Sequence, residues 1–154
     1  MTLKKYYNIA KTQLFPITRS LTGEGVKSTL NIIKKEFPKL KIKKFKSGTK
    51  VFDWNIPEEW NVTDAYVIDK YNNRIIDFKK NNLHLVGYSI PIKKNITKKE
   101  LFKNLYFLKN QPKAIPYITS YYKRRWGFCI SYYEYKILDK RYSLNDKFKV
   151  VINS

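Results

Sequence analysis

The spacing of hydrophobic positions along the chain changes near residue 38. In segments 2–14 and 22–37 the apolar residues recur every three or four positions, which predicts one helix in each segment. Pro16 and Pro38 follow these segments and end them, because proline cannot continue a helix. Thr22 is the expected N-cap of the second helix. The apolar stripes consist of Leu3, Tyr6, Tyr7, Ala10 and Leu14 in the first segment, and Val26, Leu30, Ile33 and Phe37 in the second.

Beyond Pro38 the apolar residues alternate with polar ones or form short runs, and both patterns are typical of β-strands. Residues 63–69 and 74–78 are expected to form a hairpin. Thr97 and Glu100 have the spacing of a capping box, which starts another helix. The elements together predict the α+β class with a mainly antiparallel β-rich part. Further strands are expected at 40–45, 51–54, 83–92, 127–131 and 148–152, with Leu101, Leu105 and Leu108 on the helix after Thr97, an irregular segment at 109–126 and a helical turn at 132–138.

Composition narrows the class of protein. The 154 residues correspond to about one ordinary domain, and a hydrophobic fraction of 43% with 16% aromatic residues excludes a disordered chain. No stretch of 18 residues lacks a charge, so we expect no transmembrane helix and no membrane partner. The N-terminus does not have the pattern of a secretory signal, and a single cysteine excludes an internal disulfide. We therefore expect a cytoplasmic protein.

The formal net charge of +20 suggests an anionic partner. However, 27 of the 32 basic residues are Lys and only five are Arg. The chain is also rich in Ile, Asn and Tyr, so an A/T-rich genome is a sufficient explanation for the excess of Lys. Base readout and bidentate phosphate contacts favour Arg. The composition therefore argues against nucleic acid as the partner, although a weak interaction through the lysine surface stays an alternative.

The residues that usually carry catalysis or hold metals are scarce. His84 is the only histidine and Cys129 the only cysteine, whereas a zinc site needs three or four ligands. His84 is interpreted as a strand histidine with its hydrogen bonds satisfied, and Cys129 as a buried, inert thiol; a dyad of the two is the weaker alternative. The sequence lacks a Gly-x-Ser-x-Gly motif. We predict no catalytic residue and no metal ligand in this chain.

Two segments are candidates for ligand contacts. Around Gly23-Glu24-Gly25 the sequence lacks the preceding strand of a dinucleotide site, but a helix N-terminus beside polar side chains can bind an anion. Ordinary capping is the alternative. Residues 115–128 combine aromatic, hydroxyl and Arg side chains, a mixture typical of pockets and interfaces, although the aromatic rings can also pack on the core. The candidate residues are Arg19, Ser20, Thr22, Tyr121, Tyr122, Arg125 and Trp126.

Several stretches in a fixed order resemble one family closely. They are 14–26 (LFPITRSLTGEGV), 47–54 (SGTKVFDW), 57–66 (PEEWNVTDAY), 82–89 (NLHLVGYS), 111–112 (QP), 115–117 (IPY) and 126–129 (WGFC). The chain resembles the N-terminal part of the aminopeptidase-like proteins of bacterial polysaccharide-biosynthesis clusters. The resemblance extends from about Leu14 to Ser154. Relatives commonly have His at the position of Tyr132, so this member departs from the pattern there.

The resemblance implies a zinc-exopeptidase-like α/β/α domain that is interrupted by an inserted β-rich domain and followed by a winged helix. Residues 1–47 would hold two helices and the first strand of an incomplete peptidase-like domain. Residues 48–145 would be the inserted domain, and 146–154 a strand that returns to the peptidase sheet. The final β-like run is an unusual place for a chain to stop, which is a further reason to expect a longer protein.

The resemblance also implies a function. The complete protein would be a zinc-dependent hydrolase of amides next to a free amine, with the metal motif beyond Ser154 and no cofactor in this chain. The expected partners are the remainder of the peptidase-like domain or a second copy of the chain, and the inserted domain would shape the substrate cleft or mediate assembly. The alternative is a non-catalytic module that binds an anionic ligand such as an acidic saccharide.

Overall fold

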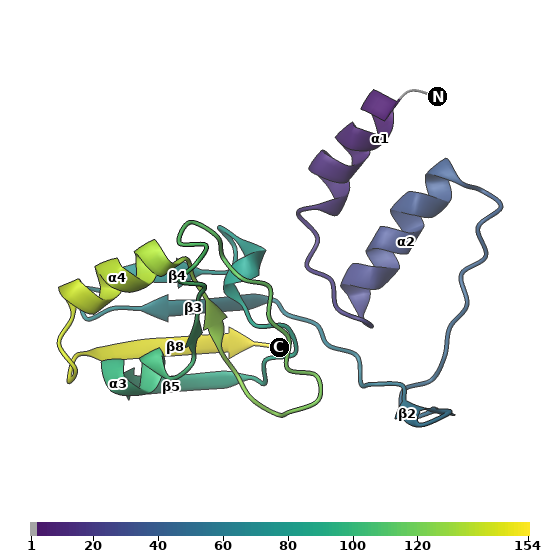
Figure 1. Cartoon of the computed structure of the whole chain (residues 1–154). Coiled ribbons are helices and arrows are strands. Elements are labelled where there is room, and N and C mark those ends of the chain that lie inside the picture. The colour runs from purple at the N-terminus through teal and green to yellow at the C-terminus, as the bar shows by residue number, and fades with distance from the viewer. Residues whose placement is uncertain (1–2) are drawn as a thin grey trace. The chain divides into compact units, whose positions relative to one another are not determined.

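A computed structural model describes residues 3–154, which form two compact units divided between Asn61 and Val62. The first unit contains two helical segments and a small hairpin (Figure 1). Its elements are α1 (Leu3–Ile9), the π-helical continuation η1 (Ala10–Leu14), α2 (Glu24–Glu36), β1 (Lys50–Val51) and β2 (Trp54–Asn55). The two predicted helices are confirmed, and the π-helical turn extends the first of them to Leu14.

The start of α2 differs from the prediction by one residue. Gly23, not Thr22, is the N-cap, and its φ of 99° is a conformation that favours glycine. A Cβ at this position would lie 2.7 Å from the backbone oxygen of Trp60. The amide of Glu24 donates to Oδ1 of Asn61 over 2.8 Å. A side chain from 37 residues away thus caps the helix in place of a neighbouring one.

No residue between Leu3 and Asn61 is buried. The helices contact each other through the stacked rings of Tyr6 and Phe37, 6.0 Å apart, and through an ion pair of Lys5 with Glu36. Several large apolar side chains in this unit are exposed to solvent, and the others are only partly buried. The exposed ones include Leu3, Tyr7, Phe15, Leu21, Phe37, Phe45, Phe52 and Trp54. The unit therefore lacks a hydrophobic core of its own.

The second unit is built on a four-stranded antiparallel sheet with the strand order β4-β3-β8-β5. The last strand in the sequence, β8, lies between β3 and β5 (Figure 1). A two-stranded parallel pair of β6 and β7 lies outside this sheet. The elements are β3 (Asp64–Ile68), β4 (Arg74–Asp77), η2 (Asn82–His84), β5 (Ile92–Thr97), α3 (Lys98–Phe102), β6 (Leu105–Tyr106), β7 (Phe128–Cys129), α4 (Tyr132–Arg141) and β8 (Lys147–Asn153).

The core lies between one face of the sheet and the segments that cover it. Alternate residues of β3 and β8 are completely buried on this face, among them Val67, Phe148 and Val150. A β-bulge in β4 leaves Ile75 without a partner in β3, because Val67 pairs with Ile76 and the next β3 residue pairs with Arg74. Ile75 and Ile76 consequently both reach the pocket beside α4.

Several predicted elements differ from the observed ones. The hairpin at 63–78 and the final strand are confirmed. Residues 40–45 form no strand, and 51–54 contains the turn between β1 and β2 rather than one strand. The run 83–92 is a 3₁₀ turn and a loop, and the strand β5 begins after Pro91. The helix after Thr97 ends at Phe102, so Leu105 belongs to β6, whereas 132–138 is part of a ten-residue helix.

The two compact units of this chain divide at 61/62. The domain boundaries at 47/48 and 145/146, which the resemblance implies for the complete protein, stay a prediction. The strand at 146–154 pairs with β3 and β5, so it belongs to the same unit as the segment before it. The reason is that its alternating apolar residues complete the core face of this sheet. The structure is a mixed α and β fold with mainly antiparallel sheets, as the sequence predicted.

Candidate functional site

The seven predicted ligand residues are divided between the two compact units. Arg19, Ser20 and Thr22 lie in the first unit, and the other four lie in the second. Arg19 donates from Nη1 to the backbone oxygen of Leu14 over 2.6 Å and is 3.4 Å from Oγ1 of Thr29. This arginine therefore binds the last turn of η1, where a helix exposes carbonyl groups.

Ser20 and Thr22 also bind the chain itself. The Ser20 hydroxyl donates to the backbone oxygen of Thr22 over 2.5 Å, and the Thr22 hydroxyl donates to that of Glu58 over 3.0 Å. The first free amide of α2 is already bonded to Asn61. In these contacts both hydroxyls donate to loop carbonyls, so they order the loop before α2, while Asn61 caps the helix itself.

Tyr121 and Tyr122 form an aromatic cluster on the loop after Ser120. Their ring centroids lie 4.0 Å apart, and Tyr88 contacts Tyr121 at 5.7 Å. A hydrogen bond with Tyr122 is the main reason why the pKa of Tyr121 is raised above its usual value. Tyr122 is 76% exposed, so the outer face of this cluster is accessible.

Arg125 orders the segment that precedes Trp126. Its guanidinium carbon lies 5.4 Å from the ring centre of Tyr106, and Nη2 is 3.4 Å from the backbone oxygen of Thr119. The backbone oxygen of Arg125 accepts from the amide of Ile90. Arg125 is half-buried, and these contacts help to hold the backbone next to Trp126.

Trp126 lines a groove at the edge of the sheet, with a volume of about 290 Å³. The groove, called the Trp126 groove below, is formed by one face of β5, by α3 and the turn after it, and by the indole. Its lining residues are Ile92, Lys94, Ile96, Glu100, Lys103, Asn104 and Trp126. Trp126 is thus a predicted ligand residue that lines a cavity of the second unit.

The cations of the Trp126 groove were missed by the sequence analysis. Lys94 lies between Ile92 and Ile96 on the same face of β5, at a position where the alternation would place an apolar residue. Glu100 is the only carboxylate in the lining. A hydrogen bond from the backbone of Thr97 lowers the pKa of Glu100, and so do the nearby charges of Lys94 and Lys103.

Gly127 fixes the backbone beside Trp126. A Cβ on this residue would lie 2.7 Å from Cε2 of Tyr106 and 3.0 Å from the backbone oxygen of Asn104. The amide of Phe128 donates to that same oxygen over 2.8 Å. The close approach needs glycine and holds the turn after α3 against the tryptophan segment.

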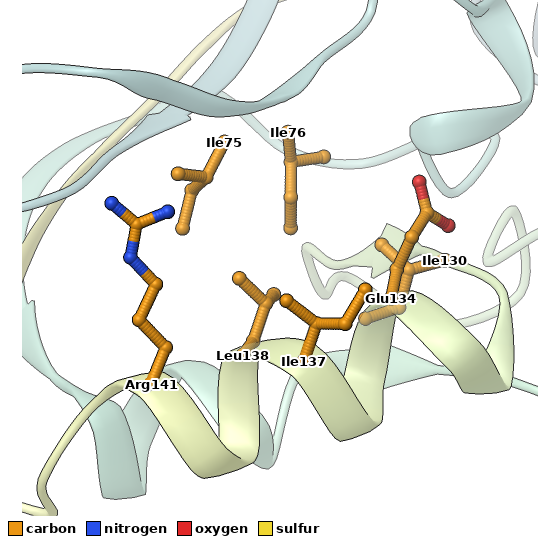
Figure 2. A pocket seen from close by; sticks show the side chains of 7 residues that line it. All are labelled: Ile75, Ile76, Ile130, Glu134, Ile137, Leu138 and Arg141. Carbon is orange, nitrogen blue, oxygen red and sulfur yellow. The ribbon is translucent and has the colours of Figure 1, made fainter.

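An apolar pocket of about 190 Å³ lies between α4 and the edge strand β4 (Figure 2). Isoleucine side chains from both elements point into it, with Leu138 at its base. Glu134 and Arg141 lie at opposite ends of the pocket (Figure 2). Both have partners, since Glu134 accepts from Ser131 in a capping box and Arg141 lies 3.9 Å from Asp69.

His84 and Cys129 do not form a catalytic pair. His84 lies in the 3₁₀ turn η2 rather than in a strand, and its Nδ1 is 2.8 Å from the backbone oxygen of Cys129, not from the thiol. Its Nε2 is 4.0 Å from Glu134. Burial raises the pKa of the Cys129 thiol to about 12. The thiol is therefore protonated and buried, as expected for a structural cysteine.

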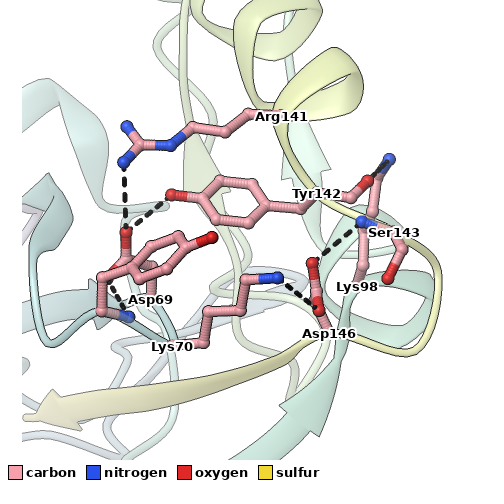
Figure 3. Close-up of polar contacts among 8 residues, drawn as sticks. Asp69, Lys70, Lys98, Arg141, Tyr142, Ser143 and Asp146 are labelled. Carbon is pink, nitrogen blue, oxygen red and sulfur yellow. Dashed lines mark hydrogen bonds and ion pairs between the residues drawn. The ribbon is translucent and has the colours of Figure 1, made fainter.

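A buried carboxylate links the β3–β4 hairpin to the end of α4 (Figure 3). Asp69 accepts from the hydroxyl of Tyr142 over 2.7 Å and from the amides of Tyr71 and Asn73. Burial alone would raise the pKa of Asp69, but these hydrogen bonds outweigh it and lower the pKa below the usual 3.8. Because these contacts of the Asp69 carboxylate are all with other residues of this chain, the cluster stabilises the fold.

A family model described as a domain of unknown function, DUF2172, matches residues 59–154. This chain belongs to the DUF2172 family. The match begins close to the division at Asn61 and covers the whole second unit. The DUF2172 unit is therefore the part of the chain that contains the sheet and the Trp126 groove.

Two comparisons extend the likeness to nearly the full chain. A Clostridium acetobutylicum protein, named for polysaccharide biosynthesis and an aminopeptidase-like domain, is 47% identical over 148 residues, which are 96% of this chain and 32% of that protein. A crystal structure from the same organism, of a protein that carries the name of a peptidase, matches 97% of this chain and 34% of its own, with 45% identity and a TM-score of 0.88. This DUF2172 chain spans about a third of the length of these relatives.

The residues present do not fit a metal site. Between Leu3 and Ser154 there is no group of three or more His, Cys, Asp or Glu side chains that could hold a metal ion. The zinc that the family resemblance implies thus has no ligand set among them. None of the helices in the same part of the DUF2172 chain is long and apolar enough to cross a membrane.

Proposed function

We propose that this chain is a non-catalytic part of a zinc-dependent, aminopeptidase-like hydrolase of polysaccharide biosynthesis. The hydrolytic site and its metal would belong to segments that correspond to the other two thirds of the relatives. The name of the Clostridium acetobutylicum relative supports the link to an aminopeptidase-like domain. In the complete protein the DUF2172 unit would shape the substrate cleft.

The observation that carries this proposal is the missing core of the first unit. No residue from Leu3 to Asn61 is buried, although α1 and α2 have clear apolar stripes. Burying one large apolar side chain contributes about 1.5–3 kcal/mol, and this unit leaves several of them in water. The helical segments Leu3–Leu14 and Glu24–Glu36 are also only marginally stable in water without tertiary packing, because isolated helices of this length are marginal. A protein segment that covers the stripes would supply the missing stability.

The occupant of this face is, in our proposal, the remainder of the peptidase-like domain. The relatives have about two thirds of their length outside the matched part, which is enough chain for such a domain. A second copy of this chain is the alternative occupant. It would cover the same stripes in a dimer of the 154-residue chain.

Hydrogen exchange on this chain and on the complete gene product tests the proposal. Amides of α1 and α2 should exchange rapidly in the 154-residue chain and slowly in the longer protein, while β3 and β8 stay protected in both. Zinc content and hydrolysis of an aminoacyl p-nitroanilide should appear only with the longer protein. Stoichiometric zinc in the 154-residue chain, or slow exchange of α1 and α2 in a dimer of it, would contradict the proposal.

A further inference from the structure

We propose that the Trp126 groove binds an acidic sugar residue of the hexuronate or sialate type. The sugar ring would lie on the indole, and its carboxylate between Lys94 and Lys103. The proposal concerns only the DUF2172 unit, so it does not depend on whether the longer protein is a peptidase. It gives the alternative of an acidic-saccharide module a defined place in the fold.

The first argument is that the core face of the sheet is not fully covered at β5. β5 is an edge strand, bonded on one side to β8. Ile96 at one end of the groove is buried, while Lys94 on the same face of β5 is exposed. The core face of the sheet is therefore accessible to solvent at the middle of β5. The volume of about 290 Å³ is at the low end for ligand pockets and suits a group the size of one or two sugar rings.

The second argument is the charge of the groove. Two ammonium groups and one carboxylate line it. Lys94 and Lys103 both lower the pKa of Glu100 through space, but neither forms an ion pair with any of residues 3–154. Glu100 itself accepts hydrogen bonds from the amide and hydroxyl of Thr97 in the capping box. The carboxylate is thus engaged by the chain, whereas both ammonium groups remain available to an anion.

The third argument is the fixed aromatic surface. Trp126 contacts Phe128 edge to face at 6.4 Å, and the close approach at Gly127 holds the following backbone. An indole face offers apolar area to the C–H groups of a sugar ring with little loss of side-chain entropy. A single aromatic ring, without an Arg in the lining, fits one sugar ring better than the successive stacked bases of a nucleic acid.

A protective role for Lys94 is the main alternative. Inward-pointing charges on edge strands prevent pairing with other chains. That role needs no ligand and explains neither the tryptophan nor the second lysine. It predicts that Lys94→Gln promotes self-association and leaves sugar binding unaffected.

Calorimetric titration of the full 154-residue chain tests the proposal. The probes are galacturonate, glucuronate and N-acetylneuraminate, with glucose as the neutral probe and a short oligothymidylate as the nucleic-acid probe. The variants are Trp126→Ala, Lys94→Gln and Lys103→Gln, each checked for folding by thermal unfolding. Lys109→Gln is the matched charge control, because Lys109 is exposed and outside the groove.

We expect at least one acidic sugar to bind saturably and at least about tenfold more tightly than glucose. Trp126→Ala, Lys94→Gln and Lys103→Gln should each weaken that binding by about tenfold or more, and Lys109→Gln by less than about twofold. Absence of binding for all three acidic sugars overturns the proposal. An equal loss of affinity in Lys109→Gln and in the two groove-lysine variants would also overturn it. So would an oligothymidylate that binds as tightly as the acidic sugars. Either result would mean that the ligands are attracted diffusely to the lysine-rich surface.

Discussion

Replacing Tyr142 by Phe tests the buried link between the β3–β4 hairpin and α4. Tyr142 is 3% exposed, and its ring contacts Phe148 edge to face at 5.0 Å, so the substitution removes a hydroxyl without opening a cavity. Oδ2 of Asp69 would keep only Nδ2 of Asn73 at 3.3 Å and the guanidinium of Arg141 at 3.9 Å. A hydrogen bond to a buried charged group is worth about 1.5–3 kcal/mol, and we expect the free energy of unfolding to fall by that amount at neutral pH.

The pH dependence of this loss follows from the direction of the pKa shift. Because the pKa of Asp69 is lower in the folded protein than the usual 3.8, its contribution is complete above pH 3.8. The contribution disappears as the pH falls through the folded pKa below that value. The stability difference between wild type and Tyr142→Phe should therefore be constant from neutral pH to about pH 5 and shrink in stronger acid.

Urea unfolding followed by circular dichroism measures both the loss of stability and its pH dependence. For Tyr142→Phe we expect a lower midpoint urea concentration and an unchanged dependence of the free energy of unfolding on urea. Tyr133→Phe is the matched control, since Tyr133 lies on α4 with 51% of its surface exposed and should change stability by less than about 0.5 kcal/mol. A loss of less than about 0.5 kcal/mol for Tyr142→Phe would refute the reasoning. A stability difference that grows in acid would refute the assignment of the charge to Asp69.

Three further predictions concern single residues of the DUF2172 unit. The Cys129 thiol, whose pKa burial raises to about 12, should react with an aromatic disulfide reagent only as fast as the unit unfolds; rapid reaction at pH 8 without urea would contradict this. Gly127→Ala should destabilise the unit by about 1–3 kcal/mol in thermal unfolding, whereas Gly87→Ala, whose Cβ would have its nearest neighbour at 3.4 Å, should be tolerated; equal effects would contradict the packing argument. Lys98→Met should lower the free energy of unfolding in urea by about 1–3 kcal/mol, because the buried Lys98 donates to two carbonyls at the end of α4. An unchanged urea midpoint would mean that these hydrogen bonds contribute nothing to stability.

Local signals in the sequence were sufficient for several elements. The hairpin of β3 and β4 was predictable because both strands have apolar alternation and the turn residues between them are Tyr71, Asn72 and Asn73. The long helix α4 was underestimated, although Ser131 and Glu134 have the capping-box spacing that was used at Thr97. The capping box at Ser131 is thus a local sequence signal for the start of α4.

Tertiary pairing decided the segments where the prediction was wrong. Residues 83–92 have the apolar run of a buried strand, but Leu85 and Gly87 form single bridges to separate partners, Phe128 and Thr119. Tyr88 has a φ of 61°, which no regular strand accommodates. The strand β5 was missed because its middle residues are polar, as an edge strand allows.

The candidate site was predictable only in part. The aromatic density of the sequence identified Trp126, which lines the groove. Lys94 was not identified, because nothing in the sequence distinguishes it from the other lysines of the chain until β5 is placed at the edge of the sheet. The division of the seven predicted residues between two units also could not be foreseen from sequence, since it depends on which segments pack together.

The position of β8 has a consequence for how the DUF2172 unit forms. β3 and β5 each bond to β8 and not to each other, so the sheet has no continuous hydrogen-bonded ladder before residues 147–153 are in place. During synthesis, the hairpin of β3 and β4 would leave the ribosome early, and its β3 edge would stay unpaired until the roughly seventy residues between β4 and β8 had been made. Pairing over such sequence separation is slow and exposes apolar surface to aggregation. A chaperone would therefore be needed by the nascent chain more than by the folded protein.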